Sequence, residues 1–404
     1  MVKTSTPPLW LALSGAALLS LTSCSKENLT PESSDAQGAL PGTSVGSGTP
    51  IAGQYIVVLK DDATTSKRPS GTKLSFDQAI AQVRETTQPL LRQYGVAGSN
   101  VLQTYGTVLQ GAAVRLTEQQ AADLRRDPRV EYVEQDQLLA VGPTQAAVSA
   151  AAAQTTPYGI SRVGAGNGAG RTAWVIDTGI DLTHPDLVVD VNRSRSFVSG
   201  VTSPNDGNGH GTHVAGTIAA RNTGVGVVGV AYGATVVAVR VLGADGSGSN
   251  SGVIAGVDYV GANGSAGDVA NMSLGGGTST ALDNAVRNAS ARVLFALAAG
   301  NESTVATSSS PGRVNGTNIF TISAMNSSDS WASYSNYGNP PVDYCMPGSS
   351  VYSTYIGGGY ATLSGTSMAT PHMAGVLLLR GKNFTTSGRV RNDPDGNADP
   401  IAHL

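Results

Sequence analysis

Residues 365–372 (GTSMATPH) place the hydroxyl of Ser367 immediately before an apolar stretch. That stretch, residues 374–379 (AGVLLL), predicts a buried helix in which Pro371 is tolerated only within the first turn. The start of a helix carries unpaired N–H groups and the positive end of the helix dipole, which favour developing negative charge. Ser367 could therefore be a nucleophile, although a pattern of this kind on its own more often marks an ordinary helix cap.

Two other segments supply the groups that a serine nucleophile requires. Residues 172–176 (TAWVI) predict a buried parallel strand followed by Asp177, and an acid at the carboxyl end of such a strand faces a crevice. Residues 208–216 (NGHGTHVAG) place His210 at the start of a second helix of small residues. A serine needs a base to take its proton, and the base needs a carboxylate that fixes its tautomer. Taken alone, Asp177 could be a turn residue and His210 a polar helix start.

The three segments occur in the order Asp, His, Ser, which is one of three unrelated orders of the catalytic triad. Together, VIDTG at 175–179, HGTHVAG at 210–216 and GTSMATPH at 365–372 resemble the three signatures of subtilisin-like serine proteases of family S8, closest to the proteinase K branch. The resemblance covers roughly residues 154–380. It implies that Asp177 orients the base, that His210 is the general base and acid, and that Ser367 is the nucleophile.

The resemblance also implies an oxyanion donor and a substrate cleft. Asn301 follows the apolar run 293–299 and matches the family's oxyanion-hole amide, although a Gly-Asn pair after a strand is otherwise a common turn. Two Gly-rich edges could pair with an extended peptide on both sides. The residues that we expect to line the cleft are Gly246, Ser247, Gly248, Ser273, Leu274, Gly275, Ala299 and Gly300. Among them, Ser273, Leu274, Gly275, Ala299 and Gly300 would line the pocket for the side chain before the cut. No acid lies among these five, which predicts a broad preference for apolar or aromatic residues at that position.

Strands and helices alternate after residue 154, which predicts an α/β fold with a subtilisin-like parallel sheet covered by helices on both faces. Strands are expected at residues 172–176, 236–242, 269–274, 293–299 and 319–324, and helices near 210–220, 252–262 and 281–291. The peptidase domain is expected to occupy residues 154–404.

A smaller α+β domain is expected at residues 54–140. The predicted order is strand 55–59, helix 76–94, strands 101–103 and 112–116, a helix that opens with a capping box at Thr117, and strand 130–135. This βαββαβ order suggests a ferredoxin-like sandwich, and it resembles the inhibitory I9-type propeptide of subtilisin-like proteases. An independent adhesion or binding module is the alternative. The Ala-, Gln- and Ser-rich residues 141–153 form a linker that we expect Ser367 to cut near residues 150–153.

Residues 1–24 are interpreted as a lipoprotein signal peptide. Lys3 precedes an apolar core at 9–21, and LTSC at 21–24 resembles a bacterial lipobox in which Cys24 is lipidated. An ordinary secretory signal with a chance cysteine is the alternative, and both readings imply export. Residues 25–53 read as a flexible tether. The lipid would lie on the propeptide side of the cut, so the precursor is expected at a membrane or cell surface and the mature enzyme in solution.

Metal and cysteine chemistry are assigned minor roles. Asp186 and Asp343 match calcium-binding carboxylates of the family and imply a structural calcium site, but both could be plain surface acids, and Thr223 replaces a usual Asn. A zinc role for His213 is disfavoured because the metalloprotease pattern requires His at i and i+4 with a Glu between them. No cofactor is expected for the chemistry. Cys345 is expected to be a buried hydrophobe without a disulfide partner.

The net charge of −3, spread along the chain, gives no sign of nucleic-acid binding. We therefore expect a monomeric, secreted serine endopeptidase that acts on polypeptides, with its own propeptide as chaperone and inhibitor. An esterase would call for Gly-x-Ser-x-Gly around its nucleophile. An inactive binding protein would be expected to lack a member of the triad or the oxyanion amide, and none is missing.

Overall fold

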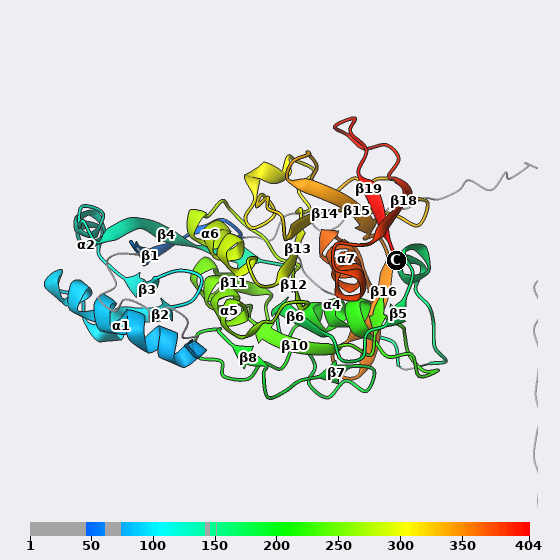
Figure 1. Cartoon of the computed structure of the whole chain (residues 1–404), viewed down its shortest axis with the longest axis horizontal. Coiled ribbons are helices and arrows are strands. Elements are labelled where there is room, and N and C mark those ends of the chain that lie inside the picture. Colours follow the sequence, from blue (N-terminus) through cyan, green and yellow to red (C-terminus); the bar gives the residue numbers. More distant parts are fainter. Residues whose placement is uncertain (1–45, 61–73, 142–145, 151) are drawn as a thin grey trace, which may run out of the picture. The chain divides into compact units, whose positions relative to one another are not determined.

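The computed structural model describes residues 46–60, 74–141, 146–150 and 152–404 (Figure 1). The predicted signal segment, Cys24 and most of the tether lie outside the described residues. In the described part of the chain, no helix combines the length and the apolar character that crossing a membrane requires.

The N-terminal domain has the predicted βαββαβ order. Its elements are β1 (Pro50–Leu59), α1 (Phe76–Gln93), β2 (Val101–Tyr105), β3 (Gly111–Arg115), α2 (Glu118–Leu124) and β4 (Val130–Ala140), with a short 3₁₀ turn at Gly98–Asn100. Antiparallel pairing gives the strand order β4-β1-β3-β2, as in a ferredoxin-like sandwich. The capping box at Thr117 is present, with Gln120 as its partner. Because β1 begins at Pro50 rather than at residue 54, the folded domain starts inside the predicted tether.

The C-terminal domain is built on a parallel sheet with the order β15-β14-β13-β12-β6-β10-β7, and β8 also pairs with β10. The strands are β6 (Thr172–Asp177), β7 (Val188–Val189), β8 (Arg195–Ser196), β10 (Thr235–Arg240), β12 (Val269–Met272), β13 (Leu294–Ala298), β14 (Ile319–Met325) and β15 (Val342–Pro347). The helices are α4 (His210–Ala219), α5 (Asn250–Asn263), α6 (Thr280–Ala289) and α7 (Thr366–Arg380). The predicted α/β fold is confirmed.

Alternate residues of the central strand β6 point to opposite faces of the sheet, as the pleat requires. Trp174 and Ile176 pack into one apolar cluster with α5 and α6, whereas Ala173 and Val175 pack into another with α4 and α7. All four side chains are fully buried. This double burial explains why β6 reads as a continuous apolar run, and Figure 1 shows helices on either side of the sheet.

Smaller elements complete the domain. They are the short helix α3 (Tyr158–Val163), the pair β5 (Gly166–Asn167) and β9 (Ala231–Tyr232), the hairpin β16 (Val351–Tyr355) and β17 (Gly359–Leu363), a 3₁₀ turn at Ala306–Ser308, and the pair β18 (Thr385–Arg389) and β19 (Pro400–His403). The β16–β17 hairpin contacts α4. The tail after Gly381 forms the β18–β19 pair, and β19 contacts β15 and α3.

The N-terminal domain is joined to the peptidase domain by a shared sheet and by buried carboxylates. Strand β11 (Ser247–Ser249) of the peptidase domain pairs antiparallel with the end of β4. Asp258 of α5 is fully buried and accepts the backbone N–H groups of Gly106, Thr107 and Val108 from the N-terminal domain. In the other direction, Asp136 of β4 accepts the N–H of Ser251 in the first turn of α5, and Glu134 accepts two N–H groups at the start of α6. Each helix start thus receives a carboxylate, which suits its dipole.

Candidate active site

Asp177 and His210 form a buried pair where β6 ends and α4 begins. Their side chains are 0% and 3% exposed, and Nδ1 of His210 lies 2.8 Å from Oδ1 of Asp177. Since a carboxylate only accepts, Nδ1 carries the proton and Nε2 remains the basic atom. Burial alone would lower the pKa of His210, but the charge of Asp177, its hydrogen bond and the charge of Asp206 together raise that pKa above its ordinary value. The imidazole is therefore fixed in one tautomer and prepared to accept a proton.

Ser367 is half-buried at the start of α7, the position predicted from its sequence. Its hydroxyl donates to the carbonyl oxygen of Ser273 at 3.1 Å. In return, the hydroxyl of Ser273 donates to the carbonyl oxygen of Ser367 at 2.8 Å and accepts from Nδ2 of Asn271 at 2.9 Å. The start of α7 is thus held against the end of β12. In this structure the hydroxyl of Ser367 is thus bonded to the residue that directly follows β12.

Asn301 lies just beyond β13, and its amide is oriented by α7. Oδ1 of Asn301 accepts the N–H of Thr366 at 2.8 Å and its hydroxyl at 3.0 Å. This leaves Nδ2 as the group able to donate into the site. A Cβ placed on Gly365 would lie 3.6 Å from Nδ2 of Asn301 and 3.6 Å from the backbone nitrogen of Ser367. Both nitrogens therefore lie close to Gly365, as does Oδ1 of Asn301, which is 3.7 Å from the same point.

The end of β4 runs between the two Gly-rich edges that were expected to bind a substrate, residues 245–248 and 273–276. Leu139 pairs with Gly248 on one side and with Gly276 on the other, and the N–H of Val141 donates to the carbonyl of Gly246 at 3.0 Å. Leu139 is fully buried in the apolar cluster that also contains Leu274. Among the other predicted cleft residues, Ser247 pairs with Ala140, Ser273 contacts Ser367 as described, Gly275 lies just before Gly276, and Ala299 and Gly300 precede Asn301.

The linker follows a different path from the one expected. Residues around 150–153 were expected in the cleft, but Ser149 pairs with Tyr360 of β17, with its N–H donating to the Tyr360 carbonyl at 2.9 Å. Ala153 pairs with Val225 and Thr155 pairs with Val227. The segment that occupies the cleft is therefore the end of β4, because it can pair with strand edges on both sides.

Sequence reasoning missed three polar residues that contact this site. They are Thr366, Asp206 and Glu302, which lie next to or four positions from the motif residues. Oε2 of Glu302 accepts the N–H of Asn301 at 2.9 Å and Nδ2 of Asn336 at 2.7 Å. The sequence cue for all three was their proximity to a triad or oxyanion residue, because a turn that holds such a residue needs its own acceptors.

The remaining histidines and Cys345 are structural. Burial lowers the pKa of His213 to about 3 and that of His372 to about 4. Nε2 of His213 lies 3.0 Å from the carbonyl oxygen of Val351, and Nε2 of His184 lies 3.0 Å from that of Gly359. Burial raises the pKa of the Cys345 thiol well above its usual value, which opposes a role as a nucleophile.

Asp186 has an oxygen that a cation would satisfy. Its Oδ2 accepts the N–H of Val227 at 3.0 Å and the hydroxyl of Tyr360 at 3.2 Å, whereas its Oδ1 is buried without a hydrogen-bond partner. Burial also raises the pKa of Asp186. Burial raises the pKa of Asp343 to about 6, and its Oδ2 accepts the N–H of Thr321. Within the described ranges no three His, Cys, Asp or Glu side chains gather as a metal cluster, so a calcium ion at Asp186 would have to rely on carbonyl oxygens.

Comparisons with known proteins show the family to which the chain belongs. Residues 168–386, more than half of the chain, match the model of the subtilase family, and residues 54–141 match that of the peptidase inhibitor I9 family. An extracellular serine proteinase of Thermus sp. (strain Rt41A) is 40% identical over 378 residues, which cover 92% of this chain and 88% of that protein. An alkaline serine exoprotease A of Vibrio alginolyticus is 43% identical over 81% of this chain, which spans 60% of the Vibrio protein.

A solved structure gives the same result. The crystal structure of a cold adapted subtilisin-like serine proteinase is 41% identical and superimposes with a TM-score of 0.55, covering 61% of this chain and 97% of that one. The chain therefore belongs to the subtilase family of serine endopeptidases and carries a peptidase inhibitor I9 domain ahead of its peptidase domain.

Proposed function

We propose that Asp177, His210 and Ser367 form the catalytic triad of this enzyme and that Asn301 is its oxyanion donor. Ser367 rotates its hydroxyl from the Ser273 carbonyl toward Nε2 of His210, gives up the proton and attacks the scissile carbonyl carbon. The oxyanion forms between Nδ2 of Asn301 and the N–H of Ser367. His210 returns the proton to the leaving amine, and water then hydrolyses the acyl-enzyme by the reverse sequence. The observation that carries this proposal is the buried 2.8 Å pair of His210 and Asp177.

Substrates would bind as an extended strand between the two Gly-rich edges. The support is the end of β4, which pairs with Gly248 and Gly276 at Leu139 in the manner expected of a substrate. Leu139 is fully buried, so at least one subsite accepts a large apolar side chain. A broad preference for apolar or aromatic residues follows, with Gly246, Ser247, Ser273, Leu274, Gly275, Ala299 and Gly300 as further contacts.

The N-terminal domain would serve as the inhibitor of the precursor and be removed by Ser367. Val141 lies in the cleft beside Gly246, whereas Ser149 is already paired with Tyr360 on the peptidase domain. The bond that is cut would therefore lie between Val141 and Ser149, and not near residues 150–153. The segment from Ser149 onward would stay with the mature enzyme.

Two further roles stay proposals. Cys24 would carry a lipid that holds the exported precursor at a membrane, and the cut would release a secreted, monomeric enzyme. Asp186 would bind a structural calcium ion through its buried, unpartnered Oδ1. For Asp343 the support is weaker, since one of its oxygens already accepts a backbone N–H.

Casein hydrolysis, combined with labelling by a serine-directed covalent inhibitor, tests the triad. The unchanged enzyme should degrade casein and lose activity on labelling. Ser367→Ala should lose both properties and remain at precursor size in a host without other proteases. Ser364→Ala is the matched control, because the hydroxyl of Ser364 only accepts the N–H of Ser350. Processing of Ser367→Ala in that host would refute self-cleavage, and hydrolysis of small esters without casein cleavage would favour an esterase.

A further inference from the structure

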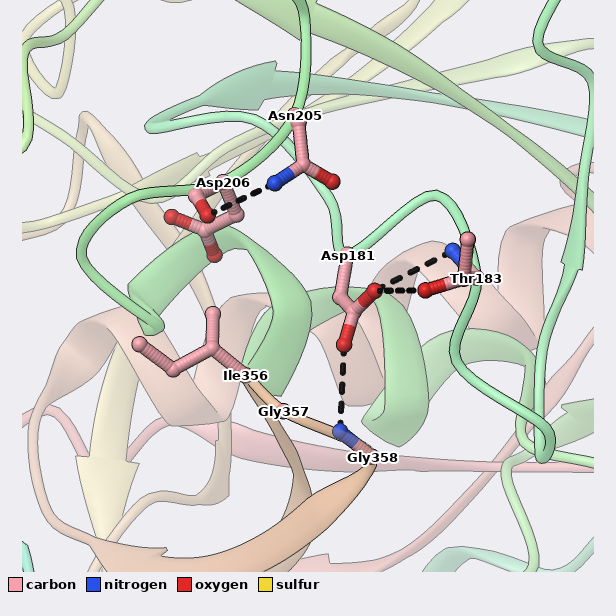
Figure 2. Close-up of a pocket in the computed structure, with 7 residues that line it drawn as sticks. All are labelled: Asp181, Thr183, Asn205, Asp206, Ile356, Gly357 and Gly358. Carbon is pink, nitrogen blue, oxygen red and sulfur yellow. Dashed lines mark hydrogen bonds between the residues drawn. The ribbon is translucent and has the colours of Figure 1, made fainter.

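The carboxylate of Asp206, four residues before His210 in the sequence, is a second buried carboxylate beside the Asp177–His210 pair. Asp206 is 4% exposed and, with Asp181, lines a polar cavity of about 500 Å³ (Figure 2). The other lining residues are Thr183, Asn205, Ile356, Gly357 and Gly358. The carboxylates of Asp181 and Asp206 accept hydrogen bonds from different segments of the chain. Asp181 accepts from Thr183 and from the N–H of Gly358, as Figure 2 shows.

Asp206 instead connects the end of β6 with the start of α4. Its Oδ1 accepts the hydroxyl of Thr178 at 2.9 Å, the N–H of Asn208 at 2.9 Å and the N–H of Gly209 at 3.0 Å. Its Oδ2 accepts both the N–H and the hydroxyl of Thr212, at 3.0 and 2.7 Å. Thr178 directly follows Asp177, and Gly209 directly precedes His210. One carboxylate therefore holds a neighbour of each member of the pair.

The turn before His210 depends on such an anchor. Gly209 has a φ of 110°, in the left-handed region, and a Cβ there would lie 2.3 Å from the ring of Tyr355. The chain is thus turned sharply just before the imidazole, and the N–H groups of the turn need an acceptor. The hydroxyl of Thr178 also accepts the N–H of Gly211 at 2.9 Å, so it links the residue after β6 directly to α4.

We infer that Asp206 is a positioning residue of the catalytic site, which fixes His210 against Asp177 and supplies a second negative charge behind the imidazole. This inference rests on the proposed triad. Asp206 bonds to no atom of the triad side chains, so its effect is exerted through the turn and through its electrostatic field.

The titratable groups around His210 allow that field to be measured. They are Asp177 on β6, Asp206 in the preceding turn, His213 on α4, Tyr355 on β16 and His372 on α7. Of these, Asp177 and Asp206 raise the pKa of His210. Loss of the charge of Asp206 should therefore lower that pKa, and the acid limb of kcat/KM should move to lower pH.

The test is the pH profile of Asp206→Asn beside that of Asp181→Asn. An asparagine amide cannot accept from Thr212 at the position of its nitrogen, so kcat should fall about tenfold to a hundredfold with little change in KM. The acid limb should move to lower pH, because the charge of Asp206 raises the pKa of His210. Asp181→Asn removes a carboxylate from the same cavity, and it should keep the wild-type profile because the side chain of Asp181 bonds to Thr183 and Gly358 and not to the turn before His210.

Thr178→Val separates position from charge, since it breaks one bond to Asp206 and leaves the charge in place. Its kcat should fall while its acid limb stays where it is in the wild type. Labelling with a serine-directed inhibitor counts the folded, active molecules in every preparation, so a folding defect is not mistaken for a catalytic one. If the wild type is not labelled, the triad proposal fails. If the wild type is labelled and Asp206→Asn shows the wild-type kcat and acid limb, or if Asp181→Asn shifts them equally, the positioning role is refuted.

Discussion

At the scale of single residues, the proposed oxyanion site depends on how the side-chain amide of Asn301 is oriented. An asparagine presents either an acceptor or a donor to its surroundings, and only the donor stabilises an oxyanion. Thr366 settles this choice, because its N–H and its hydroxyl both donate to Oδ1 of Asn301. The hydroxyl of Thr366 also accepts the N–H of Gly300 at 3.2 Å, which holds the turn that carries Asn301. Nδ2 is then the end of the amide that we propose donates to the oxyanion.

Thr366→Val should therefore weaken turnover without weakening binding. The valine keeps the backbone N–H bond but loses the hydroxyl, so we expect kcat to fall about tenfold with KM unchanged. Asn301→Ala should cost more, about a hundredfold to a thousandfold, a range established on a subtilisin. Thr366→Ser should recover most of the loss. Steady-state kinetics on a short peptide amide measures all three variants, and a raised KM at constant kcat in Thr366→Val would contradict an orienting role.

At the scale of elements, the sequence predicted what depends on local pattern and missed what depends on distant partners. The apolar runs of β6, β10, β12, β13 and β14 and the helices α4 to α6 were identified within a few residues. The extension of β4 to Ala140 was not predicted, because the last residues of β4 pair with the Gly-rich β11, whose sequence does not indicate a strand. The pairing of Ser149 with Tyr360 also joins residues that lie far apart in the sequence, so it was not predicted either. Asp206 was missed because three of its donors are backbone N–H groups, which any sequence supplies, and its two hydroxyl donors, from Thr178 and Thr212, are brought to it only by the fold.

The contact between α5 and the N-terminal domain should respond to pH. Burial raises the pKa of Asp258 from its usual value of 3.8 to about 6, although three N–H groups oppose the shift. A carboxyl with a raised pKa favours the state in which it is protonated. The bound state therefore takes up a proton that the separated domains release, and binding weakens as the pH rises from about 4 to about 6, by up to about tenfold per pH unit. Above that window this contribution is constant.

Size-exclusion chromatography of the processed but unseparated domains measures this effect. More N-terminal domain should co-elute with the peptidase domain at pH 4.5 than at pH 7. Asp258→Asn cannot titrate and should flatten the dependence, leaving the smaller part due to Glu134 and Asp136, whose pKa values burial also raises. Asp123→Asn, at the exposed pair with Arg126, is the control and should behave as the wild type. A co-eluting fraction that increases with pH would show that the sign is wrong.

At the scale of the whole molecule, the proposed cleavage that activates the enzyme would also release it from the membrane, because of the order of the segments along the chain. The proposed lipid at Cys24 precedes the inhibitor domain, and the proposed cut follows that domain. A cut between Val141 and Ser149 would leave the pairs Ser149–Tyr360 and Thr155–Val227 intact in the mature enzyme. Its new N-terminal segment would thus stay packed beside the loop that donates to Asp186.

Cell fractionation with intact-mass measurement tests this order. In the wild type, we expect precursor in the membrane fraction and mature enzyme in the medium, with an N-terminus between residues 142 and 149. Ser367→Ala should stay in the membrane at full size, whereas Cys24→Ala should release precursor from the membrane yet yield a mature enzyme of unchanged mass. A mature N-terminus at or after residue 150 would break the pairing of Ser149 with Tyr360 and would require this segment to leave the peptidase surface and enter the cleft. That result would return the cut to the position expected from the sequence alone.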